Sequence, residues 1–421
     1  MNTNAFNRLY DYQKDAVNKT MFYNRGIVCM PTGVGKTFCQ AAMIADEIIK
    51  NPNEFRMYVV NAPRILLTYQ LLKEIYGFLI DSNIEARYMF VHSGGMADEN
   101  ELELIRKNSD IPFSQIGASI SLNDIENMMC KSLEQNLPLI FFSTYNSAEK
   151  IQSAIDRLAE NEENPIYLPP ISMVLNDEAH YLVQEQFHDI LTTVHADRCY
   201  FFTATMIHTP SDKGRGMNNA ELYGNVLYTM LPIEAIAIGK MVRPRLHIVT
   251  TDGVYNTDDY NLSLNKIISN TFKQHEEVLT KTKQTPKMLV SAKGTQDIRE
   301  FLNSAEYTTL RNEGVDIYAV SSTEEVGNQI NGERVRRQTF LKRLKKDGEN
   351  KSKKLIVLHY DILAEGIDVS GFTGIMPLRT LSKSKFLQTY GRSARPDKKD
   401  RERIDNGEIT VNDVHLFNKP Y

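Results

Sequence analysis

Short apolar runs rich in β-branched and aromatic residues alternate along the chain with stretches of helical period. Runs of this length are typical of buried strands, and their alternation with helices is typical of parallel sheets covered by helices. The pattern therefore predicts an α/β protein. The runs in the first half are Ile27–Met30, Tyr58–Asn61, Tyr88–His92, Leu139–Ser143, Ile171–Leu175 and Tyr200–Thr203. Those in the second half are Leu246–Thr250, Met288–Ser291, Ile317–Val320, Leu355–Leu358, Ile375–Leu378 and Val414–Phe417.

The alternation restarts near residue 245, after the segment Met241–Arg245. A chain of 421 residues has room for two domains of ordinary size, so we expect domains over residues 1–245 and 246–421. Residues 96–136 are polar and mostly helical in period, which predicts a surface insertion. Residues 207–224 contain glycines, a proline and paired asparagines, and they predict a long loop.

The composition is that of a folded protein whose overall charge does not attract nucleic acid. Hydrophobic residues make up 42% of the chain and charged residues 24%, and the net charge is -4. A nucleic-acid site must then be a local basic groove. The four cysteines (Cys29, Cys39, Cys130 and Cys199) form no CxxC pair, which favours free thiols over zinc ligands or disulfides. No apolar run approaches the roughly 20 residues needed to cross a bilayer, and no apolar signal region begins the sequence. We expect a cytoplasmic protein with no membrane partner.

A glycine-rich segment, Met30–Thr37, lies between a predicted strand and a predicted helix. In this context Gly33 and Gly35 allow backbone N–H groups to surround phosphate oxygens, and the helix N-terminus adds the positive end of its dipole. Lys36 would reach the β- and γ-phosphates, and Thr37 would ligate Mg²⁺. The same letters can occur by chance in a turn, but the flanking elements favour a nucleotide site.

Two adjacent carboxylates, Asp177 and Glu178, follow the predicted strand Ile171–Leu175. The carboxyl end of a strand in a parallel sheet faces the ligand crevice, and neighbouring carboxylates away from water repel each other unless a cation neutralises them. We therefore expect Asp177 to hold Mg²⁺ and Glu178 to orient and deprotonate the attacking water. The alternative is an acidic turn before a helix. The phosphate-binding segment elsewhere in the chain favours the catalytic interpretation.

Two arginines, Arg392 and Arg395, are three residues apart in the segment Gln388–Arg395. On one face of a helix both guanidinium groups can point the same way and stabilise charge on a transferred phosphoryl group. Taken alone, such a pair more often forms a solvated face.

The complete set of motifs resembles the motor core of superfamily 2 helicases and translocases. The resemblance covers nearly the whole chain in order: Tyr12-Gln13, Met30–Thr37, Ala62–Arg64, Ser143–Tyr145, Asp177–His180, Thr203–Thr205, Ser291-Ala292, Glu365–Asp368 and Gln388–Arg395. It implies two tandem RecA-like domains, each a mostly parallel sheet flanked by helices, that clamp ATP and Mg²⁺ in the cleft between them.

The resemblance also implies a role for each matching residue. Gln13 would read adenine, although Tyr10 stands where arginine is common, and Gly366 and Asp368 would approach ATP. Arg392 and Arg395 would complete the site from the second domain. Coupling between ATP and nucleic acid would involve His180, Thr203, Thr205 and Gln388. Nucleic-acid contacts would involve Pro63, Arg64, Thr144 and Ser291.

The letters Asp-Glu-Ala-His at 177–180 occur in both DNA and RNA motors. The segments Glu221–Tyr228 and Glu234–Gly239 resemble the double-strand DNA motors of type I and type III restriction enzymes and their phage relatives, and Ser143–Ser147 favours the same group. DNA is therefore favoured over RNA as the partner, in the cytoplasm of a bacterium or of a phage-infected cell. The sequence shows no nuclease signature, so a restriction enzyme would need another chain or a missing C-terminal part. A partner subunit or accessory domain is expected to supply specificity.

Three functions remain open at this point. The first is an ATP-dependent DNA helicase or double-strand DNA translocase, and the second is an RNA helicase with the same motor. The third is a nucleic-acid remodelling module that uses ATP as a switch with little unwinding. Residues 334–354 hold ten lysines or arginines against Asp347 and Glu349, and form either a solvated helix face with a lysine-rich loop or a phosphate-contacting surface.

Overall fold

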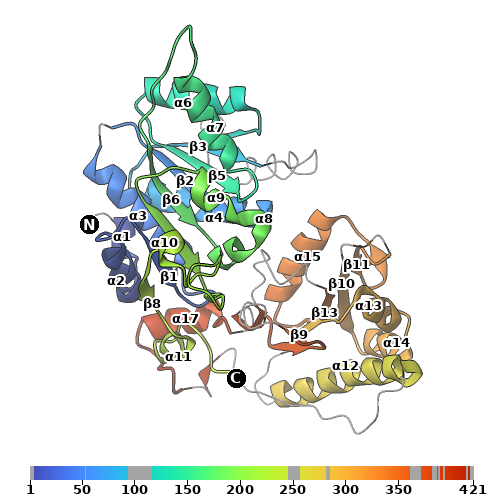
Figure 1. The fold of residues 1–421 in the computed structure, drawn as a ribbon. Coiled ribbons are helices and arrows are strands. Elements are labelled where there is room, and N and C mark those ends of the chain that lie inside the picture. The colour runs from blue at the N-terminus through green and yellow to red at the C-terminus, as the bar shows by residue number, and fades with distance from the viewer. Residues whose placement is uncertain are drawn as a thin grey trace. The chain divides into compact units, whose positions relative to one another are not determined.

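A computed structural model describes the greater part of the chain. The described residues are 4–52, 54–92, 116–244, 257–280, 285–321, 323, 325–360, 371–381, 386, 389–391, 394–413 and 416–417. The chain divides into two compact units (Figure 1). One comprises residues 1–30 and 35–230, and the other comprises residues 231–421 together with residues 31–34. The predicted boundary after residue 245 stays a prediction, since residues 245–256 lie outside the described residues.

The first unit is built on a parallel sheet. Its described strands lie in the order β4-β3-β5-β2-β6-β7-β1-β8, and each described pair is parallel. The carboxyl ends of these strands therefore meet at one edge. The strands are β1 (Arg25–Cys29), β2 (Met57–Ala62), β3 (Arg87–Val91), β4 (Ile116–Ala118), β5 (Leu139–Thr144), β6 (Ile171–Asn176), β7 (Cys199–Thr203) and β8 (Asn225–Thr229).

Helices cover both faces of this sheet. Every residue of β2 is buried, as expected for a strand with both faces covered. Met57 and Val59 lie in the core formed with α6 and α7, whereas Tyr58 and Val60 alternate with them and face the side of α4, which contacts β2. The helices are α1 (Asn4–Asn7), α2 (Asp11–Thr20), α3 (Lys36–Lys50), α4 (Ile65–Asp81), α6 (Leu122–Glu134), α7 (Glu149–Ala159), η2 (Ala179–Val183), α8 (Glu185–His188), α9 (Ile190–Thr193) and α10 (Ala220–Tyr223).

Part of the predicted insertion is built into the sheet and its core. Residues 93–115 lie outside the described residues, but β4 extends the sheet beside β3, and Ile125 and Met129 of α6 are fully buried. Residues 207–219 of the predicted long loop are irregular, but residues 220–223 form the short helix α10.

The second unit contains a mixed sheet with strand order β12-β11-β10-β13-β9-β14. β10, β13, β9 and β14 are parallel, and β11 and β12 form an antiparallel hairpin at one edge. Asn331 and Gly332 join the hairpin with φ values of 55° and 85°, the left-handed pair that a tight hairpin turn requires. The strands are β9 (Lys287–Ser291), β10 (Val315–Val320), β11 (Asn328–Ile330), β12 (Glu333–Arg334), β13 (Lys354–His359) and β14 (Gly374–Pro377).

Helices pack against this second sheet around its own core. Phe272 of α12 and Phe301 of α13 are fully buried there together with Val290 and Ile317 of the strands. The helices are α11 (Pro232–Ala237), α12 (Thr257–Thr280), α13 (Thr295–Leu302), α14 (Ala305–Asn312), α15 (Arg337–Glu349) and α17 (Lys398–Asp405). The two sheets flanked by helices confirm the predicted α/β class with two RecA-like domains. No helix among the described residues is long and apolar enough to cross a membrane.

Each strand predicted in the first half is present, with its ends shifted by at most two residues. In the second half the same holds for the four predicted strands that correspond to β9, β10, β13 and β14. Leu246–Thr250 lies outside the described residues. Of the predicted strand Val414–Phe417, residues 414–415 also lie outside them, and Leu416 and Phe417 are not in a strand. The sequence pattern did not predict β4, which has three residues, or β8, which is mostly exposed and so has no buried run.

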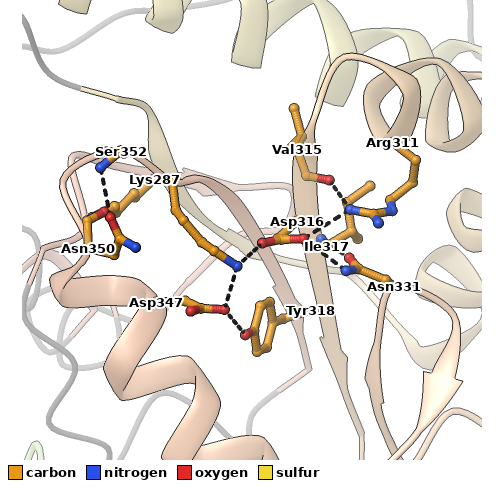
Figure 2. A network of polar contacts seen from close by, with 11 residues as sticks. Lys287, Arg311, Val315, Asp316, Ile317, Tyr318, Asn331, Asp347, Asn350 and Ser352 are labelled. Atoms are coloured by element: carbon orange, nitrogen blue, oxygen red, sulfur yellow. Dashed lines mark hydrogen bonds and ion pairs between the residues drawn. The ribbon is translucent and has the colours of Figure 1, made fainter.

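A polar network ties β10 to its surroundings (Figure 2). Asp316 accepts hydrogen bonds from Lys353 Nζ at 2.7 Å, from Asn331 Nδ2 at 2.8 Å and from Arg311 at 3.1 Å. Burial raises the pKa of Asp316, but the bonds from Lys353 and Asn331 outweigh it, so the pKa lies below its ordinary value. Asp316 thus joins the hairpin turn, α14 and the start of β13.

Replacing Asp316 by alanine should destabilise the second unit by about 1–2 kcal/mol, since three donors lose their charged acceptor at a partly solvated site. Urea unfolding at neutral pH measures this difference. Because the folded-state pKa of Asp316 is lowered, its contribution is complete above the ordinary aspartate pKa and is lost as the pH falls through the folded value. The difference between wild type and Asp316→Ala should therefore shrink below about pH 4.

Glu277→Ala is the matched control, because Glu277 is an exposed acid on α12 with no ion pair among the described residues. It should leave the unfolding transition unchanged at every pH. Equal stability of Asp316→Ala and the control at neutral pH would show that the network contributes nothing.

Candidate functional site

The glycine-rich segment forms a loop between β1 and α3. The N–H of Met30 donates to Thr203 O at 2.9 Å, so the pairing of β1 with β7 continues into the start of the loop. Gly33 and Gly35 have φ values of 89° and 86°, in the left-handed region that favours glycine. Gly35 is the residue before α3, and the loop therefore delivers its backbone to the N-terminus of a 15-residue helix. Such a helix end attracts anions.

Lys36 and Thr37 begin this helix. Lys36 is buried, and its Nζ donates to Met30 O at 3.3 Å, so the ammonium folds back over the loop. Thr37 is half-buried in the first turn. A cation and a hydroxyl held beside the N-terminal N–H groups of a helix are the groups that a nucleotide phosphate and its metal ion require.

Gln13, on α2, is hydrogen-bonded to the glycine-rich loop. Its side chain is buried, with Nε2 donating to Gly35 O at 3.2 Å and Oε1 accepting from the N–H of Tyr10 at 3.0 Å. A Cβ added to Gly35 would lie 2.4 Å from Gln13 Nε2, so a larger residue at position 35 would displace the Gln13 amide from this bond. Tyr10 and Tyr12 stack beside it, with ring centroids 5.6 Å apart. The adenine-reading role of Gln13 stays a prediction.

Asp177 and Glu178 lie at the carboxyl end of β6, two strands from β1 across β7. The N–H of Asp177 donates to Asn61 O at 2.8 Å, which continues the pairing with β2. The buried Asp177 carboxylate accepts from Gln40 Nε2 at 2.9 Å. Glu178 has a φ of 49°, a left-handed conformation that is rare outside glycine and costs about 1 kcal/mol or more. The chain thus turns sharply into η2 directly after the strand.

The acidic pair is only partly neutralised by the side chains around it. Burial, and then the neighbouring Glu178, raise the pKa of Asp177 to about 7, although Lys36 and Gln40 act in the opposite direction. Glu178 Oε2 is buried and has no hydrogen-bond partner among the described residues. A divalent cation held by Asp177 would relieve the repulsion between the two carboxylates.

The described side chains alone do not form a complete metal site. Among the described residues no group of three or more His, Cys, Asp or Glu side chains is arranged to hold a metal. A magnesium ion would therefore take oxygen ligands from Thr37, Asp177, water and nucleotide phosphates, which is the usual arrangement for Mg²⁺ at a phosphate site.

His180 connects the acidic pair to the end of β7. Its Nδ1 lies 3.2 Å from Thr203 Oγ1 and 3.5 Å from Glu178 Oε2. The single hydroxyl hydrogen of Thr203 goes to Thr205 O at 2.9 Å, so His180 must donate to Thr203 from Nδ1. Burial lowers the pKa of His180, although Glu178 acts in the opposite direction. The lowered pKa favours the neutral imidazole, in which Nδ1 carries the hydrogen. The structure thus brings His180, Thr203 and Thr205 together, and their coupling role stays a prediction.

Two residues that contact Asp177 were not predicted from the sequence. Gln40 is fully buried, and it follows Lys36 by four residues, so both lie on the same face of α3. A polar residue at that spacing within an apolar helix was the available signal. Tyr145 donates its hydroxyl hydrogen to the carbonyl oxygen of Asp177, and no local pattern indicates this contact.

The predicted nucleic-acid residues differ in their surroundings. Pro63, Arg64 and Thr144 lie at one place on the sheet edge, because Ala62 of β2 pairs with Thr144 of β5. Arg64 is exposed there. Ser291, in the second unit, is buried, and its hydroxyl lies 2.9 Å from His359 Nε2. All four assignments stay predictions.

Several residues expected to complete the site fall outside the described residues: Gly366, Asp368, Gln388 and Arg392. Arg395 is half-buried in the second unit. The segment before it is fixed within that unit, because Tyr390 donates to Val242 O at 3.1 Å and the N–H of Val242 donates to Ala394 O at 2.8 Å. The roles of both arginines stay predictions.

Comparison with known proteins relates the first unit to a family. Residues 7–208 match the family described as "Type III restriction enzyme, res subunit". No curated protein matches the chain by sequence. The first unit is thus similar to the res subunits of type III restriction enzymes.

Solved structures share the fold at low sequence identity. The ATP-dependent Type ISP restriction-modification enzyme LlaBIII bound to DNA is 17% identical with a TM-score of 0.62, covering 93% of this chain and 27% of the enzyme. A putative HsdR subunit fragment of a type I restriction enzyme from Vibrio vulnificus YJ016 is 15% identical with a TM-score of 0.56, covering 93% and 62%. S. cerevisiae Dbp5 bound to RNA and ADP BeF3 is 14% identical with a TM-score of 0.50, covering 91% and 79%. The chain thus spans about a quarter of LlaBIII and under two thirds of the HsdR fragment.

Replacing Gln40 by leucine should weaken divalent-cation binding roughly 10-fold, because Asp177 loses the donor that fixes its carboxylate. Electron paramagnetic resonance of Mn²⁺ in the presence of ADP measures this affinity without turnover. Gln186→Leu, an exposed substitution on α8, is the control and should not alter it. Wild-type Mn²⁺ affinity in a folded Gln40→Leu protein would contradict the assignment.

Proposed function

We propose that this chain is an ATP-dependent DNA helicase or double-strand DNA translocase that couples ATP hydrolysis to movement along nucleic acid. One observation carries the proposal. The phosphate-binding loop, the acidic pair and the His180–Thr203 contact lie at the ends of three adjacent parallel strands, within residues 7–208, which match restriction-enzyme res subunits.

The residues of the first unit divide the chemistry among them. Lys36 and the N-terminus of α3 would neutralise phosphate charge, and Thr37 and Asp177 would hold Mg²⁺. Bound magnesium would supply Lewis-acid stabilisation of the charge that develops on the phosphoryl oxygens. Glu178 would orient the attacking water and accept its proton.

A structural change at the nucleotide site would be transmitted through the end of β7. Thr203 receives the hydrogen bond of His180 on its side chain, and its carbonyl accepts from the N–H of Met30. A shift at either Glu178 or the loop would therefore reach Thr205 and the irregular segment that follows. We propose that this path couples hydrolysis to relative motion of the two units.

DNA is favoured over RNA as the nucleic acid along which the motor moves. The family match is to res subunits of restriction enzymes, and LlaBIII is described as bound to DNA. Because the chain spans only part of such enzymes, we propose that another domain or subunit supplies target specificity. The setting would be the cytoplasm of a bacterium or of a phage-infected cell.

The test is the ATPase rate of the full chain with duplex DNA, single-stranded DNA and RNA, alongside displacement of a triplex-forming strand and of a duplex strand. Stimulation by duplex DNA with triplex displacement supports a translocase, and separation of duplex strands supports a helicase. Stimulation by RNA alone would replace the proposal with an RNA helicase. Stimulation by DNA without either displacement would point to an ATP-switched remodelling module.

Glu178→Gln should lower DNA-stimulated ATP hydrolysis by at least about 100-fold, because the amide cannot accept the proton of the attacking water. Binding of a fluorescent ATP analogue should stay within a few-fold of wild type, because Lys36 and the loop are untouched. Stopped-flow fluorescence and phosphate release measure the two quantities separately.

Glu185→Gln on α8 is the control, because this exposed carboxylate has the same chemistry away from the acidic pair. It should hydrolyse ATP at the wild-type rate. Wild-type hydrolysis by Glu178→Gln would remove the general-base role from Glu178.

A further inference from the structure

An exposed set of cations on α15 has no assigned function. Lys342, Arg343, Lys345 and Lys346 are exposed along the helix, and Arg336 and Arg337 are exposed at its start. None of the six forms an ion pair with a described residue. We call these six residues the α15 basic face. The chain as a whole carries a net charge of -4, so this concentration of positive charge is local.

The cations of the α15 basic face repel one another. Lys342 and Lys346 are four residues apart, and Lys342 and Lys345 are three apart, so their ammonium groups are neighbours on the helix surface. Like charges at these spacings destabilise a helix, whereas a solvated helix usually alternates signs. Arg336 and Arg337 also lie at the helix end that disfavours cations. This repulsion lowers the stability of the folded protein, and a bound polyanion would relieve it.

The acidic residue nearest these lysines is turned away from the face. Asp347 is buried, and it accepts from Tyr318 Oη at 2.7 Å and from Lys353 Nζ at 3.2 Å (Figure 2). Its charge is therefore compensated inside the unit and not by the cations on the helix surface. Glu349 alone among the acids of α15 is exposed, at the last position of the helix.

The helix that carries the basic face is firmly held. Phe340 and Leu344 are fully buried, and Phe340 packs edge-on against Tyr318 with centroids 5.5 Å apart. At the other end, Lys287 Nζ donates to Gly348 O at 2.6 Å and to Asn350 O at 2.7 Å. These bonds satisfy carbonyl groups that a helix C-terminus leaves open. The cations are thus displayed at fixed spacing, about 6 Å along the row from Lys342 to Lys346.

We propose that the α15 basic face binds the phosphate backbone of duplex DNA. The inference rests on the proposed nucleic-acid motor and assigns it a contact surface in the second unit. The face has cations at regular spacing but no exposed aromatic side chain, because Phe340 points inward. Single-stranded nucleic acid is bound largely through base stacking on aromatic residues, and protein partners through apolar anchors. A surface of cations alone suits a duplex, whose bases are stacked inside and whose phosphates face outward.

The test compares two triple variants with the same change in net charge. The first is Lys342→Gln, Lys345→Gln and Lys346→Gln. The second is Lys131→Gln, Lys266→Gln and Lys399→Gln, which removes three exposed lysines spread over three other helices. Fluorescence anisotropy of a labelled duplex, titrated at several salt concentrations without nucleotide, gives the affinity and its salt dependence. Circular dichroism confirms that both variants fold.

The α15 variant should lower the slope of log affinity against log salt by about 2.7, since each lost phosphate contact contributes about 0.9. Its ATPase rate without DNA should equal wild type, and the control triple should change neither quantity. An unchanged slope, or an equal loss in the control, would overturn the inference. Loss of binding to single-stranded RNA but not duplex DNA would overturn the duplex assignment.

The two proposals fail in different ways. If wild type shows neither nucleic-acid binding nor stimulated hydrolysis, the motor proposal fails and the basic face loses its ligand. If wild type binds duplex DNA and the α15 variant does so equally well, only the inference fails. Unchanged duplex binding with lost binding to poly-L-glutamate would identify an acidic protein as the partner instead.

Discussion

The parallel pairing of β6, β7 and β1 determines where chemistry can take place in the first unit. Because these strands run the same way, the glycine-rich loop, Thr203 and the acidic pair all leave the sheet at one edge. The bond from Met30 to Thr203 then fixes the loop to the middle strand. Lys36 and Asp177, which lie far apart in the sequence, come close enough to interact electrostatically only under this constraint.

The fold of the first unit, and the positions that it brings together at the carboxyl ends of its strands, could largely be predicted from sequence because their signals are local. The loop needs its glycines within a few positions of Lys36, and Asp177 follows a buried run directly. Strands such as β2, buried on both faces, are apolar throughout and easily recognised. β8 has no such run, since four of its five residues are at least partly exposed, and its pairing with β1 depends on tertiary structure.

Contacts made by single polar side chains could not be predicted in this way. The bond from Gln40 to Asp177 joins α3 to β6, and the bond from Tyr145 joins β5 to the same residue. Each depends on the angle at which a helix or strand end meets the sheet. The surface charge of residues 334–354 could not be predicted either. From the sequence alone, the negative charge of Asp347 would offset the positive charge of the neighbouring lysines. The structure places that carboxylate on the inward side, so the sequence understates the positive charge that α15 presents.

The exposed edge at β8 has a consequence for how this protein behaves in concentrated solution. A sheet edge offers backbone donors and acceptors to any other chain, and Val226 on β8 and Phe22 beside it are exposed apolar side chains. Two features limit self-association there. β8 has only five residues, and its register with β1 shifts between Ile27 and Val28, an irregularity that twists an edge away from flat pairing. Straightening this bulge would be expected to promote aggregation before it altered activity.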